Sequence, residues 1–486
     1  MKFTRKHISL IAAAALSSCS VGPDYFVPDL KMPETFVSKA EIPTTDNVCS
    51  TQPWWSSFSS PIVSELVTRA LEKNLDITQA LERVQQSENL RREAISAFLP
   101  GVAVNGGSEK GRSSSARFPG GASGGYTYSV YNTGLAADWS IDIFGGLRRG
   151  LEAQSALHES EQDRLTLTRL YTATQVVSAF VDLKEAEQRA RIANRHMKLQ
   201  EETLRISRAR FSAGETPELD VLQAKARLSE TRATLPPIEL AVKQNINRIA
   251  IMLGEYPVDF LASELGKKIL AERTVPRFHG SLNTGTPDQT VRLRPDVAAA
   301  ERRLAANTAL IGVAVSELYP KISLGGSIGL EAADFSNLLD GAGTYRWGPS
   351  LSWRPFDNGT LRARVAAADS RARESMAAYE QTVLQAIAEI ENSGAWYNSE
   401  LERRHLLKKA LFDAVQSLQT AKAQYEVGAT DIVSVMEAEK AVLASRSNLV
   451  NARAGVSSAL LALIQASGSC AEKLPVAKGE DESNAN

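Results

Sequence analysis

The stretch KISLGGSIGL, residues Lys321 to Leu330, has the alternating pattern of a β-strand with one apolar face. The large aliphatic residues on that face are Ile322, Leu324, Ile328 and Leu330. The residues that alternate with them are Lys321, Ser323, Ser327 and Gly329. Such a strand needs an apolar partner for one face, yet most of the remaining sequence predicts helix. The nature of that partner decides the fold.

Composition indicates a mainly helical chain. The 486 residues carry a formal net charge of -1, which gives no indication of nucleic acid or an acidic membrane as a partner. Aromatic residues make up only 6% of the chain, and long tracts are rich in Ala, Gln, Glu, Arg and Leu. This composition is typical of long helices with coiled-coil-like packing.

The N-terminus has the pattern of a targeting segment. Basic residues precede the apolar run ISLIAAAAL, which is too short to cross a bilayer. The run ends in LSSC, the pattern of a bacterial lipobox. We therefore expect a lipoprotein signal peptide over residues 1–18 and a lipid on Cys19; the alternative is an ordinary signal peptide with an incidental cysteine. In either case the mature chain is exported.

Export leaves two further cysteines to explain, because disulfides persist outside the cytoplasm. Cys49 and Cys470 form an even pair. A disulfide would join the N-terminal arm to the end of the last helix. Two free, partly buried thiols are the alternative, and the sequence leaves both open.

A membrane helix is not expected after the signal peptide, because no later stretch approaches eighteen consecutive apolar residues. Without such a helix, only a closed barrel of strands could cross a membrane.

The chain contains an internal duplication. FSAGETPELDVLQAKARL, residues 211–228, recurs 214 positions later as YEVGATDIVSVMEAEKAV, and Trp139 recurs at the same spacing as Trp353. At a spacing of 220, AISAFLPGVAV is echoed by AVSELYPKISL, and LDITQALERV by RPDVAAAERRL. We therefore expect the chain to contain two copies of one structural unit.

Each repeat predicts two strands, a very long helix, a Gly turn and a return helix. In the first repeat, 75–286, these elements are expected at about 101–110, 126–143, 147–210 and 217–254. In the second, 287–470, they are expected at about 321–331, 343–354, 361–425 and 431–467. The remaining segments are an N-terminal arm with an equatorial part, 19–74, and a disordered tail, 471–486.

The long helices must pack against other helices. Each would be about 90 Å long, and their narrow seams of small residues need neighbours side by side. Pro236 and Pro237 are expected to kink or end the first return helix, because proline removes a backbone donor.

The second predicted strand of the second repeat repeats the opening pattern. Its apolar side carries Tyr345, Trp347, Leu351 and Trp353. Aromatic residues near the ends of apolar-faced strands are typical of outer-membrane barrels, in which the other face lines a water-filled lumen. Four strands per chain are fewer than the eight of the smallest such barrels. Three copies would supply twelve strands, with lipid outside.

Together these stretches resemble the TolC-like outer-membrane factors, in particular the lipoprotein branch, NodT-type, that serves resistance-nodulation-division efflux pumps. The resemblance covers nearly the whole mature chain. It is carried by CSVGPDY, WWSSFSSPIVSELVTRALEKNLDI, DWSIDIFGGLRR, LRPDVAAAERRLAAN, IGVAVSELYPKISLGGSIG and WRPFDNGTLRARV. It implies a homotrimer with a shared twelve-stranded barrel, a long α-barrel, and a periplasmic adaptor protein and inner-membrane transporter as partners.

The resemblance also implies a periplasmic gate. Gly214 and Gly428 match the turns at which an adaptor docks, and Asp220, Ser434 and Glu437 match the positions that narrow the pore. Three copies of Glu437 would form a negative ring that favours cations; the alternative is a solvated helix face. Two departures weaken the gate: Ser434 replaces an acidic residue of some relatives, and Thr430 stands where some carry Arg.

We therefore expect a passive outer-membrane conduit, lipid-anchored and with a long periplasmic extension, that exports drugs or other small toxic compounds. It is expected to be no enzyme and to need no cofactor or metal, because the five histidines lack metal-ligand spacing and no phosphate loop or nucleophile motif occurs. The alternatives are a TolC-like channel for type I protein secretion and a coiled-coil envelope scaffold without a pore.

Overall fold

The structure is a computed structural model, and it describes residues 20–38, 53–114, 126–279, 286–340 and 343–468. Several predictions concern residues outside these ranges. They are the signal peptide over 1–18, the lipid on Cys19, the pairing of Cys49 with Cys470 and the tail over 471–486.

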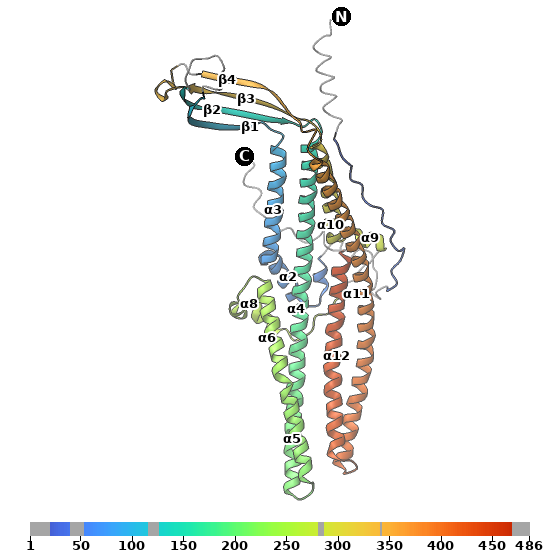
Figure 1. Cartoon of the computed structure of the whole chain (residues 1–486). Helices are drawn as coiled ribbons and strands as arrows, with labels where there is room; N and C mark the ends of the chain where they lie inside the picture. Colours follow the sequence, from blue (N-terminus) through green and yellow to red (C-terminus); the bar gives the residue numbers. More distant parts are fainter. Residues whose placement is uncertain (1–19, 39–52, 115–125, 280–285, 341–342, 469–486) are drawn as a thin grey trace. The chain divides into compact units, whose positions relative to one another are not determined.

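Over these described ranges the chain is mainly helical and has one sheet (Figure 1). The first repeat and the arm before it contain η2 (Trp54–Ser57), α2 (Pro61–Lys73), α3 (Leu75–Ser96), β1 (Gly101–Arg112), β2 (Thr127–Ile141), α4 (Gly146–Ser212), α5 (Glu218–Ala233), α6 (Leu235–Met252), α7 (Pro257–Ala262) and α8 (Glu264–Ala271). The second repeat contains α9 (Pro287–Arg292), α10 (Pro295–Ser316), β3 (Lys321–Ala332), η4 (Phe335–Asn337), β4 (Gly343–Ser352), α11 (Thr360–Glu426) and α12 (Ile432–Ser467).

The sheet is antiparallel, with the order β1-β2-β3-β4. Its central pair joins the two repeats, because β2 pairs with β3 from Tyr131↔Ala332 to Ile141↔Ile322. Two predicted strand ends were too late. β2 ends at Ile141, where the amide of Ile143 turns back to the carbonyl of Ile141, and β4 ends at Ser352, shortly before a proline that cannot donate to a ladder.

The tryptophans that recur in the sequence make the same contact in both repeats. Trp139 Nε1 donates to Phe98 O at 2.8 Å, and Trp353 Nε1 donates to Leu318 O at 3.1 Å. Both acceptors lie just after the helix that precedes the first strand of their repeat, and they are themselves 220 positions apart. The duplication seen in the sequence is therefore also a duplication of tertiary contacts.

A second repeated contact ties the return helices to the start of each repeat. Asn74 Nδ2 donates to Met252 O at 2.9 Å, at the end of α6. The equivalent Arg294 donates from Nη1 to Ala466 O at 2.7 Å, in the last turn of α12. Each side chain thus satisfies a carbonyl that the end of a helix leaves without an intrahelical partner.

Two helices of 67 residues, α4 and α11, lead to the Gly turns. Each forms a hairpin with its return helix (Figure 1). The predicted break in the first return helix is confirmed, because α5 ends at Ala233 and α6 starts at Leu235. Pro236 and Pro237 lie in the first turn of α6, where backbone amides have no partner within the helix, so their missing N–H groups cost no helical hydrogen bond. In the second repeat α12 runs unbroken for 36 residues.

The compact units of the chain differ from the repeats. One unit takes its described residues from 1–29, 83–161 and 300–379 and contains the sheet. The other takes them from 30–82, 162–299 and 380–486. Both repeats contribute to both units, because the long helices pass from one unit into the other.

The second unit has the larger core. Its largest fully buried side chains come from η2, α2, α4, α6, α7, α8 and α12 and from the residue after α6; they are Trp54, Leu66, Leu170, Phe180, Leu183, Lys184, Ile249, Leu253, Phe260, Leu265, Ile269 and Leu460. Helix α12 contains a window of 18 residues with a mean hydropathy of 1.3, so by length and composition it could cross a membrane, contrary to the expectation from the sequence. The chain buries 61% of that window, as it does for a core helix.

Candidate functional site: one sheet face and two helical turns

The apolar residues predicted on β3 and β4 share one face of the sheet. Ile322 lies opposite Leu351, and Ile328 lies opposite Tyr345. Directly opposed residues of antiparallel strands point to the same side, and alternation adds Leu324, Leu330 and Trp347. Trp353 follows one residue after β4. Four of these side chains are more than three-fifths exposed: Ile328 (64%), Tyr345 (81%), Trp347 (77%) and Leu351 (65%).

The apolar face continues over the other two strands. In register, Val104 lies opposite Leu135, which lies opposite Ile328. Val102 and Trp139 extend the face toward the start of β1 and the end of β2. An exposed apolar surface that spans a whole sheet marks a contact with a membrane or another protein.

The opposite face is polar and rich in small residues. Its members include Asn105, Glu109, Asn132, Asp138, Lys321, Ser323, Ser327, Glu331, Arg346 and Ser350. The hydroxyls of Ser323 and Ser350 lie 2.7 Å apart across the β3–β4 pair. The composition of this face favours contact with water, whereas the composition of the other face favours contact with hydrocarbon.

The two outer strands each have a free edge. In the described part of the chain, β1 pairs only with β2, and β4 pairs only with β3. An edge of unpaired amides and carbonyls is a template for pairing with another chain.

The turns at Gly214 and Gly428 have the same conformation. Their φ angles are +78° and +74°, a left-handed region that favours glycine. In each turn the amide of the residue after the glycine donates to the carbonyl five residues earlier. Glu215 N donates to Arg210 O, and Ala429 N donates to Gln424 O. This pattern ends a helix and satisfies its last carbonyls.

The two hairpins pack together near these turns. A cluster of buried side chains from α4, α5 and α12 joins them, formed by Leu204, Ala224, Leu228, Ile432, Val435 and Met436. The guanidinium of Arg210 lies over the ring of Tyr425, 5.0 Å from its centre, and pairs with Glu215 at 3.2 Å. Hydrogen bonding to Tyr425 and then to Glu215 raises the pKa of Arg210.

The predicted gate residues occupy the first turns of the return helices. Asp220 lies on α5, and Ser434, at the equivalent position of the second repeat, lies on α12. Ser434 donates from its amide and its hydroxyl to Asp431 at 2.9 and 2.7 Å, which lowers the pKa of Asp431. Glu437 lies one turn further and is exposed. Within the described residues, no hydrogen bond or ion pair joins Asp220 to Ser434 or Glu437.

Further along the hairpins lies a buried polar group that the sequence pattern does not indicate. His196 on α4 is 1% exposed, and neither ring nitrogen has a hydrogen-bond partner among the described residues. Burial, followed by the charges of Arg446, Lys422 and Arg195, lowers its pKa to about 4. On its helix, His196 looks like a solvated residue beside arginines, and only the packing of neighbouring helices reveals its burial.

Among the described residues, no group of three His, Cys, Asp or Glu side chains could hold a metal ion.

Comparisons with known proteins agree with this architecture. A family model described as outer membrane efflux protein matches residues 66–255 and 286–469, one segment in each repeat. Nodulation protein T of Rhizobium leguminosarum bv. viciae is 30% identical over 450 residues, covering 92% of this chain and 90% of that protein. Outer membrane protein OprJ of Pseudomonas aeruginosa is 26% identical over 435 residues, with 89% of each chain covered. The solved structure of the outer-membrane channel OprN has a TM-score of 0.83 and 31% identity, covering 93% of this chain and 99% of that one.

Proposed function

The chain belongs to the outer membrane efflux protein family, and we propose that three copies of it form the outer-membrane conduit of a tripartite pump for small toxic compounds. That the chain has the fold of an outer-membrane channel component, as expected from its sequence, is confirmed by its relatives. The trimer, the partners, the cargo and the roles of individual residues are the finer proposal.

The observation that carries the proposal is a sheet with one apolar face, one polar face and two free edges. Hydrocarbon satisfies no backbone group, so a sheet that enters a membrane must close on itself. One chain supplies four strands, half of the smallest membrane barrels. Pairing β4 of one copy with β1 of the next closes a ring of twelve strands, with the polar face toward the lumen.

A lipid on Cys19 would begin beside this sheet. Arg149, whose side chain is 6% exposed, donates to Asp24 at 2.5 Å and to Val21 O and Gly22 O at 3.3 and 3.4 Å. These contacts hold the start of the mature chain against the first turn of α4. The anchor is therefore proposed to enter the same membrane as the strands, with the helical hairpins in the periplasm.

The turns at Gly214 and Gly428 are proposed as the docking surface of a periplasmic adaptor, which in turn contacts a resistance-nodulation-division transporter. Both turns are exposed and leave open space around the glycines. Asp220, Ser434 and Glu437 are proposed as the gate just inside them. No chemical step is assigned to the chain; its role is passage.

Conductance of the purified, folded protein in a planar bilayer tests the pore. We expect discrete channels of one size from the trimer. A silent bilayer with folded trimers present would exclude a conduit and favour a scaffold.

A strain that lacks the protein tests the cargo. We expect hypersensitivity to small toxic compounds, rescued by the wild-type chain and by Gly150→Ala, whose glycine lies in helix α4 with open space around it. Gly428→Ala forces a side chain into φ +74° and is expected to rescue poorly. Normal drug tolerance combined with loss of a secreted protein would point to type I secretion instead.

A further inference from the structure

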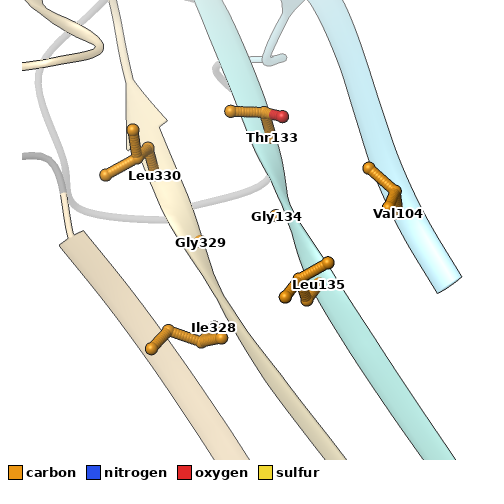
Figure 2. A pocket seen from close by; sticks show the side chains of 7 residues that line it. All are labelled: Val104, Thr133, Gly134, Leu135, Ile328, Gly329 and Leu330. Carbon is orange, nitrogen blue, oxygen red and sulfur yellow. The ribbon is translucent and has the colours of Figure 1, made fainter. Parts of the chain in front are cut away.

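A groove crosses the apolar face between β2 and β3 (Figure 2). Its volume is about 390 Å³, within the range of small-molecule sites. The side chains around it are those of Val104, Thr133, Leu135, Ile328 and Leu330, and Gly134 and Gly329 form its floor.

Two glycines face each other across the strands at the floor of the groove. Gly134 lies opposite Gly329 in the register. A Cβ atom on Gly134 would lie 2.5 Å from Ile328 O and 2.7 Å from Gly329 Cα, and one on Gly329 would collide with Thr133 O. A side chain at either position would therefore collide with the backbone of the neighbouring strand. By alternation both glycines belong to the polar face, so on the apolar face the large side chains at neighbouring positions flank an open, shallow groove.

The described chain begins beside the bases of the same two strands. Ser20 lies against Gly145, shortly after β2, and the amide of Val21 donates to Phe144 O at 3.2 Å. Gly22 touches Gly312 of α10, the helix that leads into β3. Cys19 is bonded to Ser20, so a lipid on it starts within one residue's length, about 3.8 Å, of this place.

The groove lies at a depth in the membrane that one acyl chain of the lipid on Cys19 can reach. Leu135 lies four residues along β2 from Trp139, which is about 13 Å along the strand. With a strand tilt of about 45°, the groove lies about 10 Å deeper in the membrane than the tryptophan that marks the interface. The acyl chains of one leaflet reach about 15 Å, half of the hydrocarbon core.

We propose that one acyl chain of the lipid on Cys19 lies in the groove between β2 and β3. The inference rests on the proposed lipid anchor. Any membrane lipid has the chemistry to fill the groove, but the contacts of Arg149 fix the anchor at the base of these strands. Because the acyl chain is tethered to the protein, its effective concentration at the groove is high. It therefore remains in the groove, whereas a free lipid exchanges with the bilayer.

Photocrosslinking in the full-length, lipidated protein tests this placement. A benzophenone amino acid replaces Val104, which lines the groove, or Val102, which lies on the same strand and the same face outside it. Both positions are well exposed, 78% and 67%, and channel conductance of each preparation reports that the trimer is intact. Mass spectrometry then identifies the adduct.

The expected result is an adduct within one chain between position 104 and the lipid-bearing N-terminal peptide, about tenfold more abundant than at position 102, or about 1.4 kcal/mol. The adduct is lost when Cys19→Ala is exported by an ordinary signal peptide. Adducts of position 104 only with free phospholipid, or equal yields at both positions, would overturn the proposal. An N-terminal peptide that carries no lipid would also contradict the proposed lipid anchor. A planar bilayer without conductance would contradict the proposed pore alone.

Discussion

Arg294 offers the sharpest test of how the second repeat is held together. Its side chain is 6% exposed and has three partners. It donates to Ala466 O at 2.7 Å, to both carboxylate oxygens of Asp296 at 3.0 and 2.7 Å, and to Glu389 at 2.6 Å. Burial opposes the charge, but Asp296 and Glu389 outweigh it and raise the pKa of Arg294. One guanidinium thereby joins α10, α11 and the end of α12.

Arg294→Ala leaves a helix carbonyl and two carboxylates without their donor. Asp296 and Glu389 are 26% and 53% exposed and can be solvated by water, so the main cost is the carbonyl of Ala466 left without a donor, about 1–3 kcal/mol. Arg294→Lys keeps the charge but cannot reach three acceptors with one ammonium, so we expect a smaller loss of about 1 kcal/mol. Amide hydrogen exchange in the last turn of α12 reports this locally. At 1.4 kcal/mol per factor of ten, exchange should rise by about ten- to a hundredfold in Arg294→Ala and by less than about tenfold in Arg294→Lys.

Arg292 provides a matched control two positions earlier. It pairs with Asp288 at 2.8 Å, but both side chains are about half exposed, 53% and 52%. Such surface pairs contribute about 0–1 kcal/mol, so Arg292→Ala should leave exchange in α12 nearly unchanged. If Arg294→Ala and Arg292→Ala have the same small effect, the assigned role of Arg294 in holding the end of α12 is wrong.

Three further predictions concern the hairpins. The pKa of His196 is about 4 in the folded chain against an ordinary value of 6.5, so the folded state binds fewer protons and stability is lost as pH falls from about 6.5 to 4. The loss between pH 7 and pH 5 should be about 2 kcal/mol in urea unfolding and should vanish in His196→Gln; an unchanged pH dependence would show that His196 is not buried. Asp431→Ala removes the cap of α12 and should cost about 1 kcal/mol, seen as faster exchange in its first turn, whereas Asp431→Asn should retain most of the cap. Glu437→Gln should shift the reversal potential of the channel in a salt gradient toward lower cation preference, and an identical reversal potential would remove Glu437 from the pore.

The sequence alone determined the features that depend on neighbours along the chain. The alternation of KISLGGSIGL predicted β3 and its apolar face, and Pro236 with Pro237 predicted the break between α5 and α6. The duplication predicted two equivalent Gly turns, and the structure gives Gly214 and Gly428 nearly equal φ angles. These are local preferences of the backbone, which a few adjacent residues set.

Contacts between distant residues followed from the tertiary structure. Asn74 and Arg294 differ in chemistry, so aligning the repeats did not show that both bind the end of a return helix. The burial of His196 depends on helices hundreds of residues away. The groove depends on the register that sets Leu135 against Ile328. Sequence periodicity states which side of a strand or helix is apolar, but only the pairing of segments decides which atoms meet there.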